Sequence, residues 1–201
     1  KIKKIKKNLL EKQSKVFKIV CELDLRAEKA VSPYNKNNIC SISTEDLPVD
    51  YVRTSFNSYS SFINDPDNGV PGTLKTAFDV IANADEKHVY YHCWGGADRT
   101  GALSFFLNGL CGVSLTDLYI DFELTTQHNS LRSHLKANGS YDFPAMLRAI
   151  KALPYYDENM TLAELSKKFL MENGIEEETL EKIRGFMIPG YTTGMEEVLA
   201  H

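Results

Sequence analysis

The stretch VYYHCWGGADRTG, from Val89 to Gly101, carries the strongest structural signal in the sequence. Its apolar first half predicts a buried β-strand that delivers Cys93 to its carboxyl end. The apolar run after Thr100 predicts a helix that starts there. Residues 94–99 therefore form a bend between strand and helix, at the edge where ligands of open α/β sheets bind.

The bend has the composition of an anion-binding loop. The predicted helix points its free N–H groups and the positive end of its dipole back at the bend. Gly95, Gly96 and Gly101 tolerate the backbone angles by which successive N–H groups turn inward to form a nest for an anion. A phosphate dianion suits such a loop.

Cys93 and Arg99, six positions apart, supply the chemistry. A free thiol has a pKa of ~8.5, which a helix N-terminus and a nearby cation lower to roughly 3.5–7.5. We therefore expect a Cys93 thiolate at neutral pH, with the planar fork of Arg99 gripping two phosphate oxygens. The alternative is a buried cysteine before an ordinary turn and a surface arginine. We favour phosphate chemistry, because the strand, the His-Cys pair, the glycines in the bend, the arginine and the Thr-Gly after it occur together.

The rest of the sequence places strands early and helices late. Apolar runs predict strands at 16–23, 49–56 and 87–93, the last being a central strand buried on both faces. Helical spacing is found at 74–83, 101–112, 114–124, 141–153, 162–171 and 174–188. This order predicts an α/β fold with a mainly parallel central sheet flanked by helices. The phosphate-binding loop joins the central strand to a helix, and the C-terminal half is rich in helices.

Three helix starts are indicated by capping residues. Thr73 is a candidate N-cap after a turn-rich segment. Ser114 with Asp117, and Thr161 with Glu164, have the three-residue spacing of a capping box.

Length and composition predict one globular domain, over residues 16–201, because 201 residues with 43% hydrophobic content suit a single core and would make two domains cramped. Residues 1–15 are a basic lead-in with apolar residues at helical spacing. Such a helix suits either an anionic membrane surface or the cap of a domain, and we favour the second. No apolar run approaches the ~20 residues that a transmembrane helix needs.

Several partners are disfavoured by the sequence. The net charge of −4, and the Glu-Glu-Glu run at 176–178 where a DNA-reading helix would begin, argue against nucleic acid. The four cysteines form no CxxC pair, so we expect no zinc cluster. A thiolate nucleophile makes a metal-bound water unnecessary, so we expect no metal and no cofactor. Because the sequence begins with Lys1, it does not decide between a cytoplasmic and a secreted protein. It does not predict the oligomeric state either.

The segment HCWGGADRTG fits the H-C-x5-R-[ST]-G signature of the protein tyrosine phosphatase superfamily. It most resembles the bacterial branch of tyrosine and dual-specificity phosphatases whose loop carries Asp-Arg-Thr-Gly. Residues 22–28 (ELDLRAE), 112–125 (GVSLTDLYIDFELT) and 172–184 (ENGIEEETLEKIR) are similar to that branch more loosely.

The resemblance implies catalysis in two steps. Cys93 attacks phosphorus and forms a cysteinyl-phosphate, which water then hydrolyses. The phosphate would be held by the loop, Trp94, Gly95, Gly96, Ala97, Asp98, Arg99 and Thr100. Thr100 would also donate its hydroxyl to the sulfur, and His92 would fix the nucleophile through the backbone.

The resemblance also indicates a general acid, for which Asp98 in the loop is the first candidate. Asp24, at the end of the first strand, is the second, although an aspartate beside Arg26 often only organises a turn. Asp65 and Asp67 lie in a turn-rich segment, where we favour plain turn formation.

The loop has no basic residue in its variable positions, which favours phosphotyrosine in a protein or peptide as substrate. Phosphoinositides or inositol phosphates are the alternative substrates, and a non-catalytic phosphate-binding module is the alternative class. Cys21 on the neighbouring strand is a candidate redox partner of Cys93. Arg53 and Arg132 are candidate outer phosphate contacts, although a surface role is favoured for both.

Overall fold

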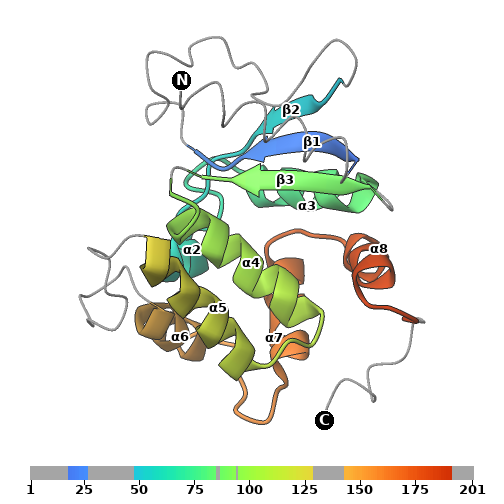
Figure 1. Ribbon diagram of the computed structural model, residues 1–201. Coiled ribbons are helices and arrows are strands. Elements are labelled where there is room, and N and C mark those ends of the chain that lie inside the picture. Colours follow the sequence, from blue (N-terminus) through green and yellow to red (C-terminus); the bar gives the residue numbers. More distant parts are fainter. Residues whose placement is uncertain (1–17, 27–47, 85–86, 94, 129–142, 192–201) are drawn as a thin grey trace.

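Three parallel strands form the sheet of this protein (Figure 1). The computed structural model describes residues 18–26, 48–84, 87–93, 95–128 and 143–191. Strand β1 (Ile19–Asp24) pairs on one side with β2 (Asp50–Arg53) and on the other with β3 (His88–His92). The expected α/β class with a parallel sheet is confirmed.

The register brings the carboxyl ends of the three strands to one edge. Asp24, the last residue of β1, lies opposite Arg53 on β2 and His92 on β3. Because a parallel sheet aligns these ends, residues that follow each strand meet at the same edge. The bend before α4 therefore lies beside the segments that follow β1 and β2.

Two helices lie between β2 and β3. Helix α2 (Tyr59–Asn64) is short, and α3 (Thr73–Asn83) buries Leu74 and Phe78 as its apolar spacing predicts. Such crossovers are what a parallel pair requires, since no tight turn can connect parallel strands.

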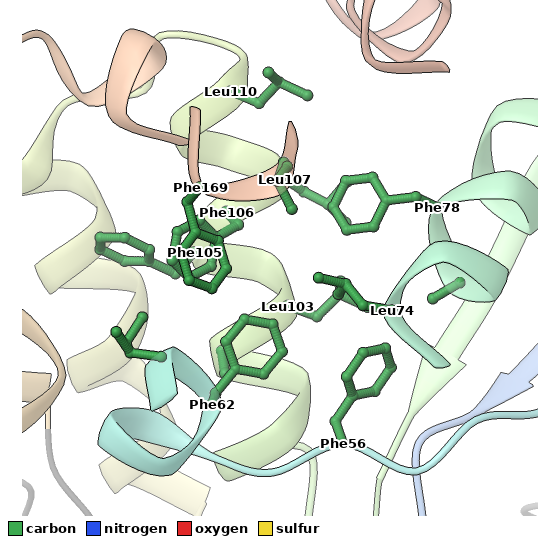
Figure 2. Close-up of a cluster of buried hydrophobic side chains, with 14 of the residues drawn as sticks. Phe56, Phe62, Leu74, Phe78, Leu103, Phe105, Phe106, Leu107, Leu110 and Phe169 are labelled. Carbon is green, nitrogen blue, oxygen red and sulfur yellow. The ribbon is translucent and has the colours of Figure 1, made fainter. Parts of the chain in front are cut away.

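Helix α4 (Asp98–Leu110) is the central helix, and its phenylalanines form the middle of the core (Figure 2). The rings of Phe106 and Phe169 stack with centroids 4.2 Å apart, and Phe62 stacks on Phe106 at 5.6 Å. Gly112, two residues after the end of the helix, has a φ of 80°, which suits the stop that glycine provides. Helix α4 is thus fixed in place by aromatic packing from α2 and α7.

The C-terminal half is helical, as expected: α5 (Leu115–His128), α6 (Phe143–Lys151), α7 (Leu162–Glu172) and α8 (Glu177–Met187). The predicted caps of two of these helices are confirmed. Ser114 Oγ accepts from the Asp117 amide at 3.1 Å, and Thr161 with Glu164 makes a full capping box. Helices α4 to α7 gather below the sheet in Figure 1.

Three local expectations are wrong. In the described sheet β1 is central and β3 is at an edge, half-buried rather than buried on both faces. Thr73 is the first residue of α3 and not its cap; Asp67 takes that role through the amides of Gly72 and Leu74. Helix α5 runs four residues beyond the predicted 114–124, to His128.

The basic lead-in and Arg132 lie outside the described residues. Across the described ranges, no helix combines the length and the apolar character that a bilayer span requires.

Candidate active site

The bend between β3 and α4 surrounds the sulfur of Cys93. Cys93 directly follows β3 and is buried, whereas Gly95 and Gly96 are exposed. Gly96 has a φ of 72°, the left-handed conformation that the inward curl of the loop requires. Of the three glycines expected to use such angles, Gly96 does so, and Gly95 and Gly101 do not.

The loop lowers the pKa of Cys93. Burial by itself raises the pKa of this thiol, but hydrogen bonds from the Thr100 side chain and from the backbone amides of Thr100, Gly96 and Gly95 lower it, and they prevail. The buried Thr100 hydroxyl makes no hydrogen bond of standard geometry in the described part of the chain. Its dipole acts on the sulfur beside it rather than through a bond of ideal geometry. Amides and hydroxyl together favour the thiolate.

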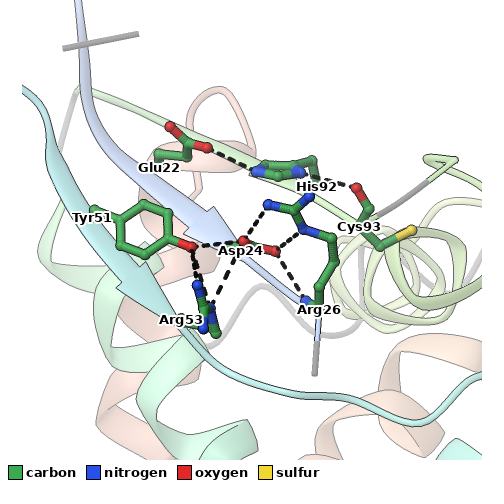
Figure 3. Close-up of polar contacts among 7 residues, drawn as sticks. All are labelled: Glu22, Asp24, Arg26, Tyr51, Arg53, His92 and Cys93. Carbon is green, nitrogen blue, oxygen red and sulfur yellow. Dashed lines mark hydrogen bonds and ion pairs between the residues drawn. The ribbon is translucent and has the colours of Figure 1, made fainter. Parts of the chain in front are cut away.

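His92 fixes the start of the loop (Figure 3). Its Nδ1 lies 3.0 Å from the carbonyl oxygen of Cys93, and its Nε2 lies 2.9 Å from Oε1 of Glu22. Burial tends to lower the pKa of His92, but the bonds to Glu22 and Cys93 raise it above the ordinary value. A protonated His92 donates to both acceptors, which holds the nucleophile's backbone as expected.

Glu22 is a site residue that sequence reasoning missed. It lies on β1 and is only 2% exposed. A glutamate inside an apolar strand was the available signal, because a buried carboxylate needs a partner.

Arg99 is anchored by a backbone carbonyl from the segment after β2. Its Nε donates to the Phe56 oxygen at 2.8 Å. The side chain is half-buried in the first turn of α4. This bond orients the guanidinium, whose fork is the group that recognises planar oxygen pairs.

Asp98 is held by a tyrosine. The Tyr59 hydroxyl donates to Asp98 Oδ1 at 3.1 Å, connecting the start of α2 to the start of α4. Tyr59 is buried, and no pattern in the sequence singled it out. Asp98 thus lies inside the bend with one oxygen fixed.

Asp24 lies at the same carboxyl end of the sheet as Cys93, but its carboxylate is bonded to Arg26 and Tyr51 (Figure 3). Its Oδ1 accepts from Arg26 Nε at 2.7 Å, and its Oδ2 accepts from Arg26 Nη2 at 2.6 Å and from the Tyr51 hydroxyl at 2.7 Å. Burial tends to raise the pKa of Asp24, but the bonds from Arg26 and Tyr51 lower it below its ordinary value. These contacts suit an ionised carboxylate that organises the strand end.

Asp65 and Asp67 form the turn before α3, as favoured from the sequence. Asp67 accepts from two amides at the start of that helix, and Asp65 accepts from the Gly69 amide at 3.1 Å. Both carboxylates are therefore used within the turn.

The proposed pairing of Cys21 with Cys93 does not fit the strand register. Cys21 lies opposite Val89, four residues before Cys93. At ~3.3 Å per residue this separates the two cysteines by about 13 Å along the sheet, well beyond the reach of a disulfide. Burial raises the pKa of the Cys21 thiol to about 11, so it is also a poor nucleophile.

Trp94 lies outside the described residues. Arg53, a candidate outer phosphate contact, donates to the Tyr51 hydroxyl at 3.1 Å, and its Nε is 3.9 Å from Asp24 Oδ2.

Within the described ranges, no group of three or more His, Cys, Asp or Glu side chains is arranged to hold a metal ion.

Comparison with known proteins identifies a family. The model of the family described as the tyrosine phosphatase family matches residues 5–188, which include every described site residue. No curated protein matches the chain. The match spans most of the sequence, and the chain therefore belongs to the tyrosine phosphatase family.

Proposed function

We propose that the protein is a cysteine-dependent phosphatase whose substrate is phosphotyrosine in a protein or peptide. The observation that carries the proposal is the placement of the buried Cys93 directly after β3, with Arg99 in the first turn of α4 and anchored by the Phe56 carbonyl. The amides between them also lower the pKa of the thiol. A thiolate with N–H donors around it is prepared to attack phosphorus and to stabilise the oxyanions of the transition state.

In the first step the Cys93 sulfur attacks phosphorus opposite the leaving oxygen. An S–P bond forms, the bond from phosphorus to the phenolic oxygen breaks, and Asp98 gives its proton to that oxygen. The amides of Gly95 and Gly96 and the guanidinium of Arg99 hold the three equatorial oxygens.

In the second step water attacks phosphorus and the S–P bond breaks. Asp98, now a carboxylate, accepts the proton from water, and inorganic phosphate leaves. The sulfur departs as a thiolate, so the Thr100 dipole and the amides that lower the pKa of Cys93 also make it a better leaving group.

Asp24 is a weaker candidate for the acid. A proton donor must be protonated before the reaction, whereas Arg26 and Tyr51 hold the pKa of Asp24 below its ordinary value. The carboxylate of Asp98 lies in the catalytic loop itself, where the Tyr59 hydroxyl orients it, and we therefore assign it the role of acid.

An aryl ester is favoured by aromatic side chains beside the loop. A cavity of about 210 Å³ lies against Gly96 and Ala97 and is lined by aromatic rings from the four helices α2, α4, α5 and α6. These are Tyr59, Phe105, Phe122 and Phe143. A ring next to the phosphate would gain apolar contact there, which a phosphoserine side chain cannot match.

The test is turnover of para-nitrophenyl phosphate by the wild-type protein and by Cys93→Ser, with Cys111→Ser as the matched control. We expect turnover in the wild type and the control and a loss of at least about a thousandfold in Cys93→Ser, since the nucleophile is removed. Retained turnover in Cys93→Ser would refute the mechanism.

The substrate class is tested on a panel of phosphotyrosine peptide, phosphoserine peptide, phosphoinositide and inositol hexakisphosphate. The highest kcat/KM is expected for the phosphotyrosine peptide. A preference for either inositol compound would replace phosphotyrosine with the alternative substrate class.

A further inference from the structure

A second cavity, of about 530 Å³, lies among the helices that gather below the sheet in Figure 1. It is lined by Phe105 and by residues from 112–115, 147–151 and 156–165, and we name it the helix cavity. These segments are the loop after α4, the last turns of α6 and the starts of α5 and α7. The volume is within the ~300–1,000 Å³ that is usual for small-molecule sites.

The wall of the helix cavity is mainly apolar. Phe105, Ile150 and Leu165 are buried core residues that line it, and Leu162 beside them is half-buried. Leu115, the first residue of α5, also lines the cavity and is 45% exposed. Contact between water and such side chains is unfavourable, and an apolar ligand that covered them would remove it. The cavity therefore suits a ligand with an apolar body.

Two cations, Arg148 and Lys151, also line the helix cavity. Both are in the last turn of α6, and both are exposed. In the part of the chain that the structure describes, neither side chain takes part in an ion pair or a hydrogen bond. The described lining contains no acidic side chain. The cavity thus combines an apolar wall with basic groups that are available to an anion.

The serine and threonine hydroxyls of the lining are already engaged in helix caps. Ser114 Oγ donates to Asp117 Oδ2 at 2.8 Å and accepts from the Asp117 amide at 3.1 Å. Thr161 Oγ1 donates to Glu164 Oε2 at 2.7 Å and accepts from the Glu164 amide at 3.2 Å. A polar ligand body would compete with these caps for partners, whereas an alkyl chain needs no hydrogen bond.

The helix cavity is distinct from the candidate active site. The cysteine loop contributes no residue to its described lining. Gly112 and Val113 line it beyond the far end of α4, a helix that extends about 20 Å from the loop. Among the described residues, Phe105 alone lines both this cavity and the 210 Å³ cavity beside the loop. A ligand in the helix cavity therefore needs no contact with Cys93 or Arg99.

We propose that the helix cavity binds a fatty acid, with the alkyl chain along the apolar wall and the carboxylate at Arg148 and Lys151. The alkyl chain matches a wall whose hydroxyls are engaged. The planar fork of an arginine binds the two oxygens of a carboxylate with paired N–H donors, and the lysine adds a further donor. Such a site is independent of the phosphatase activity proposed above.

Isothermal titration calorimetry with four ten-carbon ligands, each below its critical micelle concentration, tests the proposal. Decanoate has the proposed head group, decanol is uncharged, decylamine is cationic and decyl phosphate has a different anionic head group. We expect decanoate to bind one site about tenfold more tightly than decanol, as two exposed charge contacts allow, and decylamine to bind most weakly. Octanoate, with two fewer methylene groups, should bind about tenfold more weakly than decanoate.

Variants separate the contribution of the head group from that of the chain. Arg148→Gln/Lys151→Gln should weaken decanoate binding by about tenfold and leave decanol binding unchanged, which a misfolded protein could not do. Lys182→Gln, at an exposed position of α8 outside the described lining, is the surface control. Leu115→Gln should weaken the binding of both ligands by about fivefold. Leu124→Gln, at a similarly exposed leucine of the same helix outside that lining, should weaken neither.

Four results would overturn the proposal. Equal affinities for decanoate and decanol would show that the cations do not hold the head group. Unchanged decanoate binding in Arg148→Gln/Lys151→Gln would place the ligand elsewhere on the protein. Tighter binding of decyl phosphate than of decanoate would assign the cavity to a phosphate head group. No saturable binding of any of these ligands would leave the cavity to a protein partner.

Discussion

The hydroxyl of Tyr59 donates to Asp98 Oδ1 across 3.1 Å and so joins the first residue of α2 to the first residue of α4. Tyr59 has a φ of 51°, a left-handed conformation that is uncommon for a residue other than glycine. Such a conformation costs on the order of 1–3 kcal/mol and persists only where the surroundings fix it. We interpret the bond as the device that orients the carboxylate of the loop.

Removing the Tyr59 hydroxyl should weaken acid catalysis. In Tyr59→Phe we expect kcat for phosphotyrosine to fall by roughly tenfold, because Asp98 loses the bond that orients it. The loss should be smaller with para-nitrophenyl phosphate, whose leaving group needs less protonation. Tyr119→Phe is the control, and an equal loss with both substrates would contradict a role in protonation.

Asp24 is expected to act on stability more than on the chemistry. Asp24→Asn leaves Arg26 buried without its counter-ion, which should lower the free energy of unfolding by about 3–5 kcal/mol. Urea unfolding at neutral pH measures this change. If the variant is as stable as the wild type but its turnover falls far more for phosphotyrosine than for para-nitrophenyl phosphate, Asp24 and not Asp98 is the acid.

The same carboxylate gives a pH dependence with a defined sign. The folded-state pKa of Asp24 lies below its ordinary value of 3.8, so its contribution to stability is present above that pH. It is lost as the pH falls through the lowered folded-state pKa. The difference in stability between wild type and Asp24→Asn should therefore shrink in strong acid, and a difference that grows in acid would oppose this assignment.

Alkylation should distinguish Cys93 from the other described cysteines. Burial raises the pKa of both Cys21 and Cys111 to about 11, whereas the loop lowers that of Cys93. At pH 7 a thiol with a pKa of 11 is ionised in roughly one molecule in ten thousand. Iodoacetamide should modify Cys93 first, inorganic phosphate should slow the reaction, and peptide mass spectrometry would show the order. Faster modification of Cys21 would be incompatible with this account.

Packing of α4 against α7 should be sensitive to one methyl group. A Cβ added at Gly109 would overlap Ser166 Oγ and lie 3.3 Å from Leu162 Cγ. Gly109→Ala should therefore destabilise the fold by about 1–3 kcal/mol. Gly185→Ala in α8, where nothing lies within 4 Å, should stabilise it by about 0.5–1 kcal/mol. Thermal unfolding of both variants measures the contrast, and the double variant Gly109→Ala/Ser166→Ala should recover part of the loss.

The loop could be predicted from sequence because its parts are contiguous. Cys93, Gly96 and Thr100 lie within eight residues, so the strand, the bend and the helix start can be read together. The same locality explains why the capping pairs at α5 and α7 were found.

The supporting contacts could not be predicted, because they join distant parts of the chain. Tyr59 and Asp98 are 39 residues apart, Phe56 and Arg99 are 43 apart, and the partner of His92 lies 70 residues away. Periodicity describes one element at a time and does not say which elements meet. The order of the strands was not predicted for the same reason, because an apolar strand has the same sequence pattern at the centre and at the edge of a parallel sheet.

The most direct test of the central claim is rapid-quench intact-mass analysis during turnover of para-nitrophenyl phosphate. We predict one phosphoryl group on the wild-type chain, located at Cys93 by peptide mapping and absent from Cys93→Ser. Turnover with no phosphorylated cysteine, or a phosphoryl group on another residue, would contradict the account.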